Sequence, residues 1–593
     1  MKRTGGEIVV DYLISQRVPY ILGIPGHGVM GLFDAIRKQK GNIGYIQVKH
    51  EQAAAAIADG YFRMRGEPLA CFSSIGPGTL NTCIGLATAY VDSSAFLLLC
   101  GDTHVHMKGV GVLQEVERYQ DGNIIQALEP LAKRTWRAES AEQLPRILRR
   151  AFGQMQNGRS GPCAVMLPMD VQCAAIEEKP YQQGAQAEAR PCADSHAIEQ
   201  AVALMKQAKR PVILAGGGAL RSRAGEQIEK LAERWGAAVI TTLAAKGTVR
   251  ETHPQYGFHT GSKGTPIGLE LCRCADVILA VGTRFADETT CSYRKGVSFN
   301  FPDTKLIHID IDAAEIGKNY AADVGIAADL TDTLERLHEA YGKASERREY
   351  LAEIAQRRAD WAERLADVRA AATEKVTISQ LIGELNTHLP EDTIIVTSSG
   401  NTQAQLFQEY CYAQRGCNLT TGGFSTMGWA FPAALGAKLA CPDRPVVALL
   451  GDGDFLMVIQ ELSTMAQYNI PVVVVLADNS GWMAIKDLQM DVLGKEGVFG
   501  NDFVRGEAPY SPDFVKAAQA FGIAAERISK REECAAALQR ALSSGKPYLI
   551  HADVCRDYPY SGGSAFGWWD VPIPEYDTKR RAAYESARAE ETI

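Results

Sequence analysis

The stretch from residue 445 to residue 479 constrains the fold of this chain most. An apolar run at 445–450, typical of a buried strand, is followed by the turn Gly451-Asp452-Gly453-Asp454. A helix-like run and a second apolar run come next, and Asn479 follows the second run. Parallel strands that are joined by a right-handed helical crossover end at the same edge of their sheet. We therefore expect Asp452 and Asn479 to meet at one sheet edge.

The residue types at this edge suit a metal ion that bridges to a phosphorylated group. Carboxylate, amide and backbone carbonyl oxygens are hard ligands of the kind that Mg²⁺ prefers. Gly451 and Gly453 let backbone N–H groups approach a phosphate closely. A Gly-Asp-Gly tripeptide alone is usually an ordinary turn, but the order of strand, acidic turn, helix, strand and Asn favours a phosphate site.

The first third of the chain has the same alternation of strand and helix, which predicts a second parallel, doubly wound sheet. Gly26 and His27 lie in the turn after the expected strand at 18–24, where such sheets bind ligands. Glu51 opens an alanine-rich helix, where its charge can stabilise the helix dipole. Gly78 and Asn81 lie in the glycine turn before the next helix. From the residues alone, these positions remain either structural or ligand-binding.

Together these segments resemble the thiamine-diphosphate-dependent enzymes. Gly-Asp-Gly followed at this distance by Asn is similar to the signature that holds Mg²⁺ on the cofactor's diphosphate in that family. His50-Glu51 and the alanine-rich helix are similar to its His-Glu-x-Ala segment. Two further segments, 281–287 and 306–319, closely resemble the acetolactate synthases of the same family. The resemblance extends over residues 1–555.

The resemblance implies an α/β protein with three doubly wound parallel-sheet domains. They are a pyrimidine-binding domain at 1–175, a central domain at 190–345 and a diphosphate-binding domain at 375–560, followed by a C-terminal tail at 561–593. Composition predicts a linker near 175–192 and an exposed connecting helix at 347–374.

The resemblance also assigns roles to individual residues. Asp452, Asn479 and the carbonyl group of Gly481 would hold Mg²⁺ on the diphosphate. Glu51 would hydrogen-bond N1′ of the aminopyrimidine and act as the catalytic proton relay. Gln114 lies in a segment like the Phe-Gln-Glu of acetolactate synthases and would reach the active site, although a plain surface loop is an equal alternative.

Further residues complete the expected site. His27 replaces a family glycine in the first turn and is a catalytic candidate. Met427 would be the wedge that bends the cofactor and Met457 a neighbouring wall, unless both are ordinary core methionines. The other expected cofactor contacts are Gly26, Gly78, Asn81, Gly400, Asn401, Thr402, Thr426, Gly451, Gly453 and Asp454.

The central domain raises the question of a second cofactor. In acetolactate synthases this domain carries FAD, which takes no part in the chemistry. The family's Arg-Phe-Asp-Asp-Arg pattern is altered here to Arg284-Phe285-Ala286-Asp287-Glu288. Related decarboxylases keep the domain without a flavin. The sequence therefore leaves FAD open.

Three interpretations of the function remain. The first is an acetolactate-synthase-like lyase or transferase, which decarboxylates a 2-oxo acid and joins the product to a second carbonyl compound. The second is a hydrolase that cleaves a C–C bond of a cyclic or vicinal diketone. It is supported by His27 and by Gly567-Trp568-Trp569-Asp570, which resembles the tail of trihydroxycyclohexanedione hydrolases. The segment after Gly481 lacks a Trp that acetolactate synthases have, so the substrate stays open. A degenerate cofactor-binding subunit is disfavoured, because Glu51, Asp452 and Asn479 are all present.

The composition limits the classes of partner and the location that we expect for this chain. The net charge of −8 gives no electrostatic footprint for nucleic acid. No run of eighteen apolar residues predicts a membrane span, and the first residues lack the apolar core of a secretory signal. The 14 scattered cysteines indicate reduced thiols, so we expect a cytoplasmic protein. The family resemblance implies a homodimer or homotetramer in which two subunits share each active site.

Overall fold

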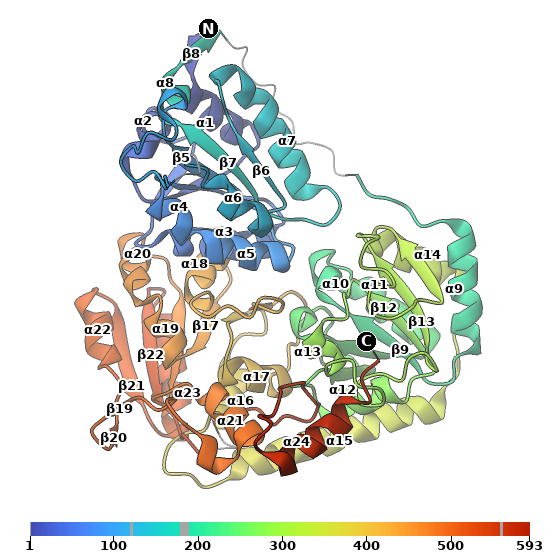
Figure 1. Ribbon diagram of the computed structural model, residues 1–593. Coiled ribbons are helices and arrows are strands. Elements are labelled where there is room, and N and C mark those ends of the chain that lie inside the picture. The colour runs from blue at the N-terminus through green and yellow to red at the C-terminus, as the bar shows by residue number, and fades with distance from the viewer. Residues whose placement is uncertain (1, 119–121, 178–188, 558–560, 593) are drawn as a thin grey trace.

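The computed structural model describes residues 2–118, 122–177, 189–557 and 561–592 (Figure 1). Within these ranges the chain builds three six-stranded sheets in which every strand pairing is parallel. The predicted fold class is therefore confirmed. The predicted linker near 175–192 falls mostly on residues 178–188, which lie outside the described ranges.

The order of the strands divides the three sheets into two kinds. The N-terminal sheet has the order β3-β2-β4-β5-β7-β6 and the C-terminal sheet the order β16-β15-β17-β18-β22-β21. These two orders are the same when each sheet is numbered from its own first strand. The central sheet has the order β11-β10-β9-β12-β13-β14, which is the order of dinucleotide-binding sheets.

The strands of the three sheets have the following bounds. In the N-terminal sheet they are β2 Tyr20–Gly23, β3 Gly44–Gln47, β4 Ala70–Ser73, β5 Leu97–Asp102, β6 Arg134–Arg137 and β7 Cys163–Pro168. In the central sheet they are β9 Pro211–Ala215, β10 Ala238–Thr241, β11 Tyr256–His259, β12 Val277–Val281, β13 Lys305–Asp310 and β14 Val324–Ala327. In the C-terminal sheet they are β15 Ile394–Thr397, β16 Asn418–Thr420, β17 Val446–Gly451, β18 Val473–Asp478, β21 Ala524–Ile528 and β22 Tyr548–Asp553. Two antiparallel pairs, β1 Lys2–Thr4 with β8 Ala175–Glu177 and β19 Val504–Arg505 with β20 Ala508–Pro509, lie apart from these sheets.

Helices cover the faces of each sheet (Figure 1). Those of the N-terminal domain include α1 Gly5–Ser15, α2 Met30–Lys38, α3 Glu51–Arg65, α5 Cys83–Val91 and α7 Leu144–Gln156. Those of the central domain include α9 Ser195–Gln207, α11 Gly225–Trp235, α12 Pro266–Arg273 and α14 Leu330–Tyr341. Those of the C-terminal domain include α16 Ile378–His388, α17 Asn401–Glu409, α18 Ala430–Ala440, α21 Met483–Leu493, α22 Phe514–Ala520 and α23 Arg531–Ser543. The predicted connecting helix is α15 Arg348–Ala370, which lies along the lower edge of Figure 1.

The N-terminal and C-terminal domains are joined through α3 and α18. A Cβ on Gly60 of α3 would lie 2.2 Å from the carbonyl oxygen of Ala433, and one on Gly436 of α18 would lie 2.0 Å from that of Ile57. The missing side chains therefore let the two backbones approach closely. One buried hydrophobic cluster runs through both domains at this contact, whereas the central domain has clusters of its own.

The C-terminal tail crosses from the C-terminal domain to the central domain, where the chain ends (Figure 1). Trp569 Nε1 donates to Asp287 Oδ2 at 2.7 Å, and the N–H of Asp570 donates to Ser292 Oγ at 2.9 Å. The tail continues as α24 Thr578–Arg588. Among the described residues, none of the helices combines the length and the apolar character that a bilayer crossing requires.

Candidate functional site

Asp452 and the turn after β18 meet at the carboxyl edge of the C-terminal sheet. Strands β17 and β18 are neighbours, with Gly451 opposite Ala477. Asp452 begins α19 (Asp452–Leu456), and its Oδ2 accepts a hydrogen bond from the N–H of Gly481 at 3.0 Å. Asn479 is buried in the same turn. The structure thus brings together the two elements that the sequence placed at one edge.

The carboxylates at this edge fit a divalent cation. Asp452 and Asp478 are 2% and 3% exposed and lie beside each other. Burial and the neighbouring Asp478 carboxylate raise the pKa of Asp452. Two buried carboxylates repel each other, and an ion with two positive charges would relieve that repulsion. Together with the oxygens of Asn479 and Gly481, the donor set has the hard character that Mg²⁺ prefers.

The neighbouring strand β15 contributes a helix N-terminus to the same edge. Gly400 precedes α17 at a φ of +138°, and no side chain caps the helix there. The N–H groups of its first turn therefore suit an anion such as a diphosphate. Thr402 is buried in this turn. Asn401 is buried too, but its Nδ2 donates to Asp487 Oδ2 at 2.9 Å and to the carbonyl oxygen of Ser561 at 3.0 Å.

Asp454 links three segments of this site. Its carboxylate accepts the hydroxyl of Ser398, which follows β15, and the N–H of Gly428, in the loop before α18. Burial raises the pKa of Asp454 to about 6. Gly453 lies under the indole of Trp482, and a Cβ on Gly453 would lie 2.2 Å from this ring. These two residues fix the shape of the turn that carries Asp452.

Met427 directly precedes Gly428 in the chain, and Met457 lies against Gly428 at this edge. Gly428 has a φ of +70°, and a Cβ there would lie 3.2 Å from Cβ of Met457. Met457 is 46% exposed and Met427 is partly buried, so neither is an ordinary core methionine. Thr426 Oγ1 lies 2.7 Å from Thr88 Oγ1 of the N-terminal domain.

Glu51 occupies the carboxyl edge of the N-terminal sheet. It is the first residue of α3, where the His50 ring caps the helix by accepting the N–H of Gln52. Asn81 Nδ2 donates to Glu51 Oε2 at 2.9 Å. Oε1 lies 3.1 Å from the position that a Cβ on Gly78 would take. Glu51, Gly78 and Asn81 therefore form one group with a buried carboxylate at its centre.

The first turn and the Gln114 segment flank this group. A Cβ on Gly26 would lie 2.4 Å from Cβ of Ser74, so the turn packs against the end of β4. Within the described part of the chain, His27 Nε2 is buried and has no hydrogen-bond partner. Gln114 is exposed, has a φ of +68°, and lies with its carbonyl oxygen against Gly76.

The sequence interpretation missed a buried pair behind the turn at Asn479–Gly481. His551 Nε2 lies 2.8 Å from Asp478 Oδ2, and both side chains are buried. Asp478 directly precedes Asn479, and His551 interrupts the apolar run of β22. An ionisable side chain in each of two buried strands was the signal that could have revealed the pair.

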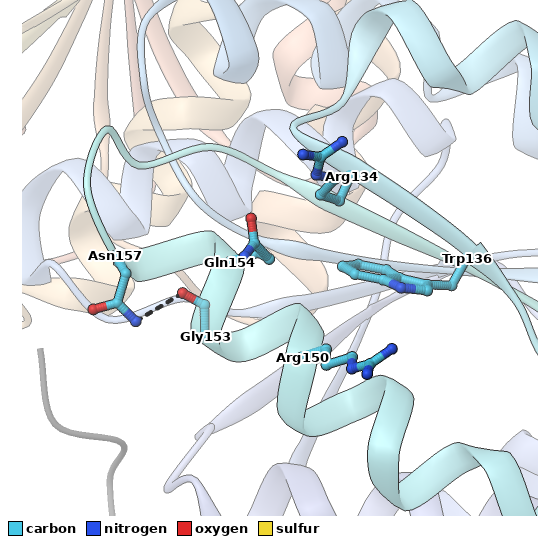
Figure 2. Close-up of a pocket in the computed structure, with 6 residues that line it drawn as sticks. All are labelled: Arg134, Trp136, Arg150, Gly153, Gln154 and Asn157. Carbon is cyan, nitrogen blue, oxygen red and sulfur yellow. Dashed lines mark hydrogen bonds between the residues drawn. The ribbon is translucent and has the colours of Figure 1, made fainter. Parts of the chain in front are cut away.

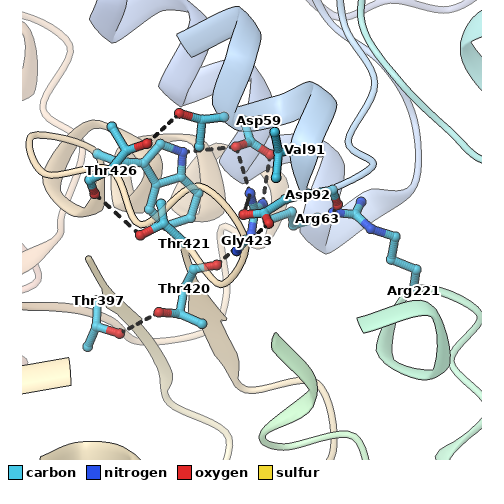
Figure 3. Close-up of polar contacts among 12 residues, drawn as sticks. Asp59, Arg63, Val91, Asp92, Arg221, Thr397, Thr420, Thr421, Gly423 and Thr426 are labelled. Carbon is cyan, nitrogen blue, oxygen red and sulfur yellow. Dashed lines mark hydrogen bonds and ion pairs between the residues drawn. The ribbon is translucent and has the colours of Figure 1, made fainter. Parts of the chain in front are cut away.

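Near the candidate site, charged side chains join all three domains (Figure 3). Arg63 forms ion pairs with Asp59 at 2.7 Å and Asp92 at 3.1 Å. It also donates to the carbonyl oxygen of Thr420 in the C-terminal domain. Arg221 of the central domain donates to the carbonyl oxygen of Asp92. The network holds the loop that carries Thr426 against the N-terminal domain.

A separate hollow of about 440 Å³ lies between β6 and α7 (Figure 2). It is lined by Arg134, Trp136, Arg150, Gly153, Gln154 and Asn157. None of the predicted site residues lines it, so it is not part of the candidate site.

Comparisons with known proteins match the three domains separately. The models of the thiamine pyrophosphate enzyme N-terminal, central and C-terminal domains match residues 3–121, 198–337 and 398–552. The chain is 34% identical to a probable acetolactate synthase large subunit of Methanocaldococcus jannaschii, over 92% of this chain and 91% of that protein. It is 32% identical to the acetolactate synthase isozyme 1 large subunit of Escherichia coli, over 93% of this chain and 94% of that protein.

Proposed function

The chain belongs to the thiamine pyrophosphate enzyme family and is a thiamine-diphosphate-dependent enzyme of the acetolactate-synthase type; from this premise we propose that it decarboxylates a 2-oxo acid and joins the product to a second carbonyl compound. The observation that supports the proposal is that two sheet edges carry the residue groups that such a site needs. Glu51 with Asn81 lies at one sheet edge, and Asp452 with the turn at Gly481 lies at another.

The residues of the C-terminal edge would hold the cofactor. Asp452, Asn479 and the carbonyl group of Gly481 are proposed to bind Mg²⁺, and the open N-terminus of α17 to bind the diphosphate. Met427 and Met457 present apolar surface beside these groups. Once bound, thiamine diphosphate supplies the electron sink that makes cleavage next to a carbonyl group feasible.

Glu51 is proposed as the catalytic proton relay. Its Oε2 accepts from Asn81, which orients the carboxylate, and its Oε1 points toward Gly78. Oε1 is therefore the oxygen of Glu51 that would be free to hold or release a proton once the cofactor is bound. Gln114, on the exposed loop that packs on Gly76, is proposed to face the substrate.

We propose that two copies of the chain share each site, in a homodimer or homotetramer. Leu80 and Ile84, on either side of Asn81 in the chain, are 44% and 45% exposed, and Leu456 and Met457 beside Asp452 are 36% and 46% exposed. A second copy that covers these apolar side chains would bring Glu51 of one subunit to Asp452 of the other.

Mixing two inactive variants tests the shared site. If Glu51→Gln and Asp452→Ala subunits exchange at random, half of the dimers contain both, and each of these has one intact site. Activity should then return to about one quarter of the wild-type value. Sites made within one subunit would give no recovery.

Release of CO₂ tests the reaction itself. The purified protein with thiamine diphosphate and Mg²⁺ should release CO₂ from pyruvate and form an acetoin-type or acetolactate-type product. Absence of CO₂ from pyruvate and from other 2-oxo acids would contradict the proposal.

A diketone hydrolase is the second candidate, and His27 favours it. Its buried, unpartnered Nε2 could take a proton from a water molecule that attacks the substrate. Such an enzyme would open a cyclic diketone without releasing CO₂. The tail residue Trp569 contacts Asp287 of the central domain, so the tail is not evidence for this candidate's pocket.

We propose that the central domain carries no flavin. Gly216 N–H donates to the carbonyl oxygen of Val281 and Gly218 N–H to that of Gly282, both at 2.9 Å. These bonds join the two turns at the edge where a dinucleotide would bind, and Asp287 is bonded to the tail. Both features favour a central domain without FAD, so the purified protein should show no flavin absorbance. All 14 cysteines are free thiols, which supports a cytoplasmic location.

A further inference from the structure

The turn that carries two of the proposed metal ligands is held by side chains to which the proposed reaction gives no role. Ser480, between Asn479 and Gly481, has a φ of +55°, a left-handed conformation that is unfavourable for a residue with a side chain. Asp478 Oδ1 stabilises it by accepting the N–H of Ser480 at 2.9 Å. The same oxygen accepts the hydroxyl of Ser511 at 2.7 Å, and Ser511 Oγ lies 2.9 Å from Ser480 Oγ.

The other oxygen of Asp478 is bonded to His551. The distance from His551 Nε2 to Asp478 Oδ2 is 2.8 Å, and the two side chains are 3% exposed. His551 lies on β22 opposite Leu476 of β18, two residues before Asp478, so the two side chains lie on the same face of the sheet. The ring of Phe514 packs edge-on against His551 at 5.3 Å between centroids and fixes its orientation.

The position of Asp478 matters because Asp452 is beside it. Asp452 accepts the N–H of Gly481 and Asp478 accepts that of Ser480, so two different carboxylates hold the Asn479–Gly481 segment. If His551 did not bind Asp478 Oδ2, this carboxylate could turn toward Asp452 and the cation. The turn would then lose the hydrogen bond that keeps Ser480 in its left-handed conformation.

We propose that the Asp478–His551 pair is the positioning element of the metal site, holding the turn so that the oxygens of Asn479 and Gly481 face the ion that Asp452 binds. This inference rests on the Mg²⁺ site of the proposed function. Asp478 and His551 act through the turn and are positioning residues.

Binding of Mn²⁺ in the presence of thiamine diphosphate tests the proposal, because electron paramagnetic resonance counts free Mn²⁺ without any turnover. His551→Leu should weaken Mn²⁺ binding by about tenfold or more, the size of effect known for lost outer hydrogen bonds at metal sites. His551→Gln keeps a donor and should restore most of the affinity. His253→Leu is the matched control, since His253 is a buried histidine 3.1 Å from Glu233 in the central domain, and it should bind like wild type.

The outcomes separate the inference from the proposed function. If folded His551→Leu binds Mn²⁺ as tightly as wild type, the inference is wrong. If His551→Leu does not fold, Ser511→Ala decides: it removes one bond to Asp478, and unchanged affinity would equally overturn the inference, whereas a several-fold loss supports it. If wild type itself binds no Mn²⁺, or binds it as tightly after Asp452→Ala, the proposed metal site fails first.

Discussion

The C-terminal and central sheets each leave an edge where the strand order reverses, and the two edges hold different chemistry. In the C-terminal sheet the turns after β15 and β17 carry an uncapped helix N-terminus and the buried carboxylate of Asp452. In the central sheet the turns after β9 and β12 lie backbone to backbone, with Gly218 bonded to Gly282. The central sheet has the strand order of dinucleotide-binding folds, yet the two turns at its edge are bonded to each other.

Strand order therefore places an edge, but the residues of the turns decide whether that edge can bind a ligand. Asp452 and Asp478 at the first edge leave charge that a cation can offset. At the second edge, the N–H of Gly218 is bonded to the carbonyl oxygen of Gly282, and Asp287 is bonded to Trp569. Variants at the two edges test this contrast, and a variant at Glu51 tests the site that the C-terminal edge would complete.

Asp452→Ala should have the largest effect. It removes the central ligand of the proposed cation, so activity should fall by about a thousandfold, the equivalent of several kcal/mol of metal assistance. Thermal unfolding without metal should change little, because the variant also removes a buried carboxylate that lies against Asp478. Retained activity at saturating Mg²⁺ would remove the contrast between the two edges.

Glu51→Gln should come next. Gln keeps the size of the side chain and can still accept from Asn81, but it cannot relay a proton. The turnover number should therefore fall by about a hundredfold. Thiamine diphosphate binding, measured by calorimetry, should stay close to wild type. Weakened binding with unchanged turnover would show that Glu51 is only a contact residue.

The features of the fold and site that could be predicted from the sequence are those set by residues close together in the chain. The meeting of Asp452 with the Asn479 turn was predictable, because a strand-helix-strand crossover fixes it locally. The bonding of Asn401 to Ser561 was not, since it depends on where a tail 160 residues away packs. The tail resembled that of diketone hydrolases, but no local pattern could show that Trp569 would contact Asp287.

Gly453→Ala and Gly216→Ala form a matched pair for the two edges. A Cβ on Gly453 meets the Trp482 ring at 2.2 Å, and a ring can shift. A Cβ on Gly216 meets the backbone oxygen of Gly282 at 2.2 Å, which cannot move alone. Gly453→Ala should weaken cofactor binding several-fold with little change in stability. Gly216→Ala should lower the free energy of unfolding by about 1–3 kcal/mol, with cofactor binding unchanged. Calorimetry and denaturant titration measure the two quantities, and the reverse pattern would contradict the assignment of the edges.

Glu288→Gln should have the smallest effect on the protein. Glu288 has a carboxyl group at which no bound cation is proposed. Burial raises the pKa of Glu288 to about 7 from an ordinary value of 4.5. The folded protein therefore holds this proton more tightly than the unfolded chain, so the resulting stability is complete below about pH 4.5 and is lost as pH rises through 7. Because Glu288 is partly accessible to solvent, wild type should lose about 1–2 kcal/mol relative to Glu288→Gln across this range. Mg²⁺ should leave the difference unchanged, since Glu288 lies at the central edge. A difference that disappears when Mg²⁺ is added would mean that the central edge also binds a cation.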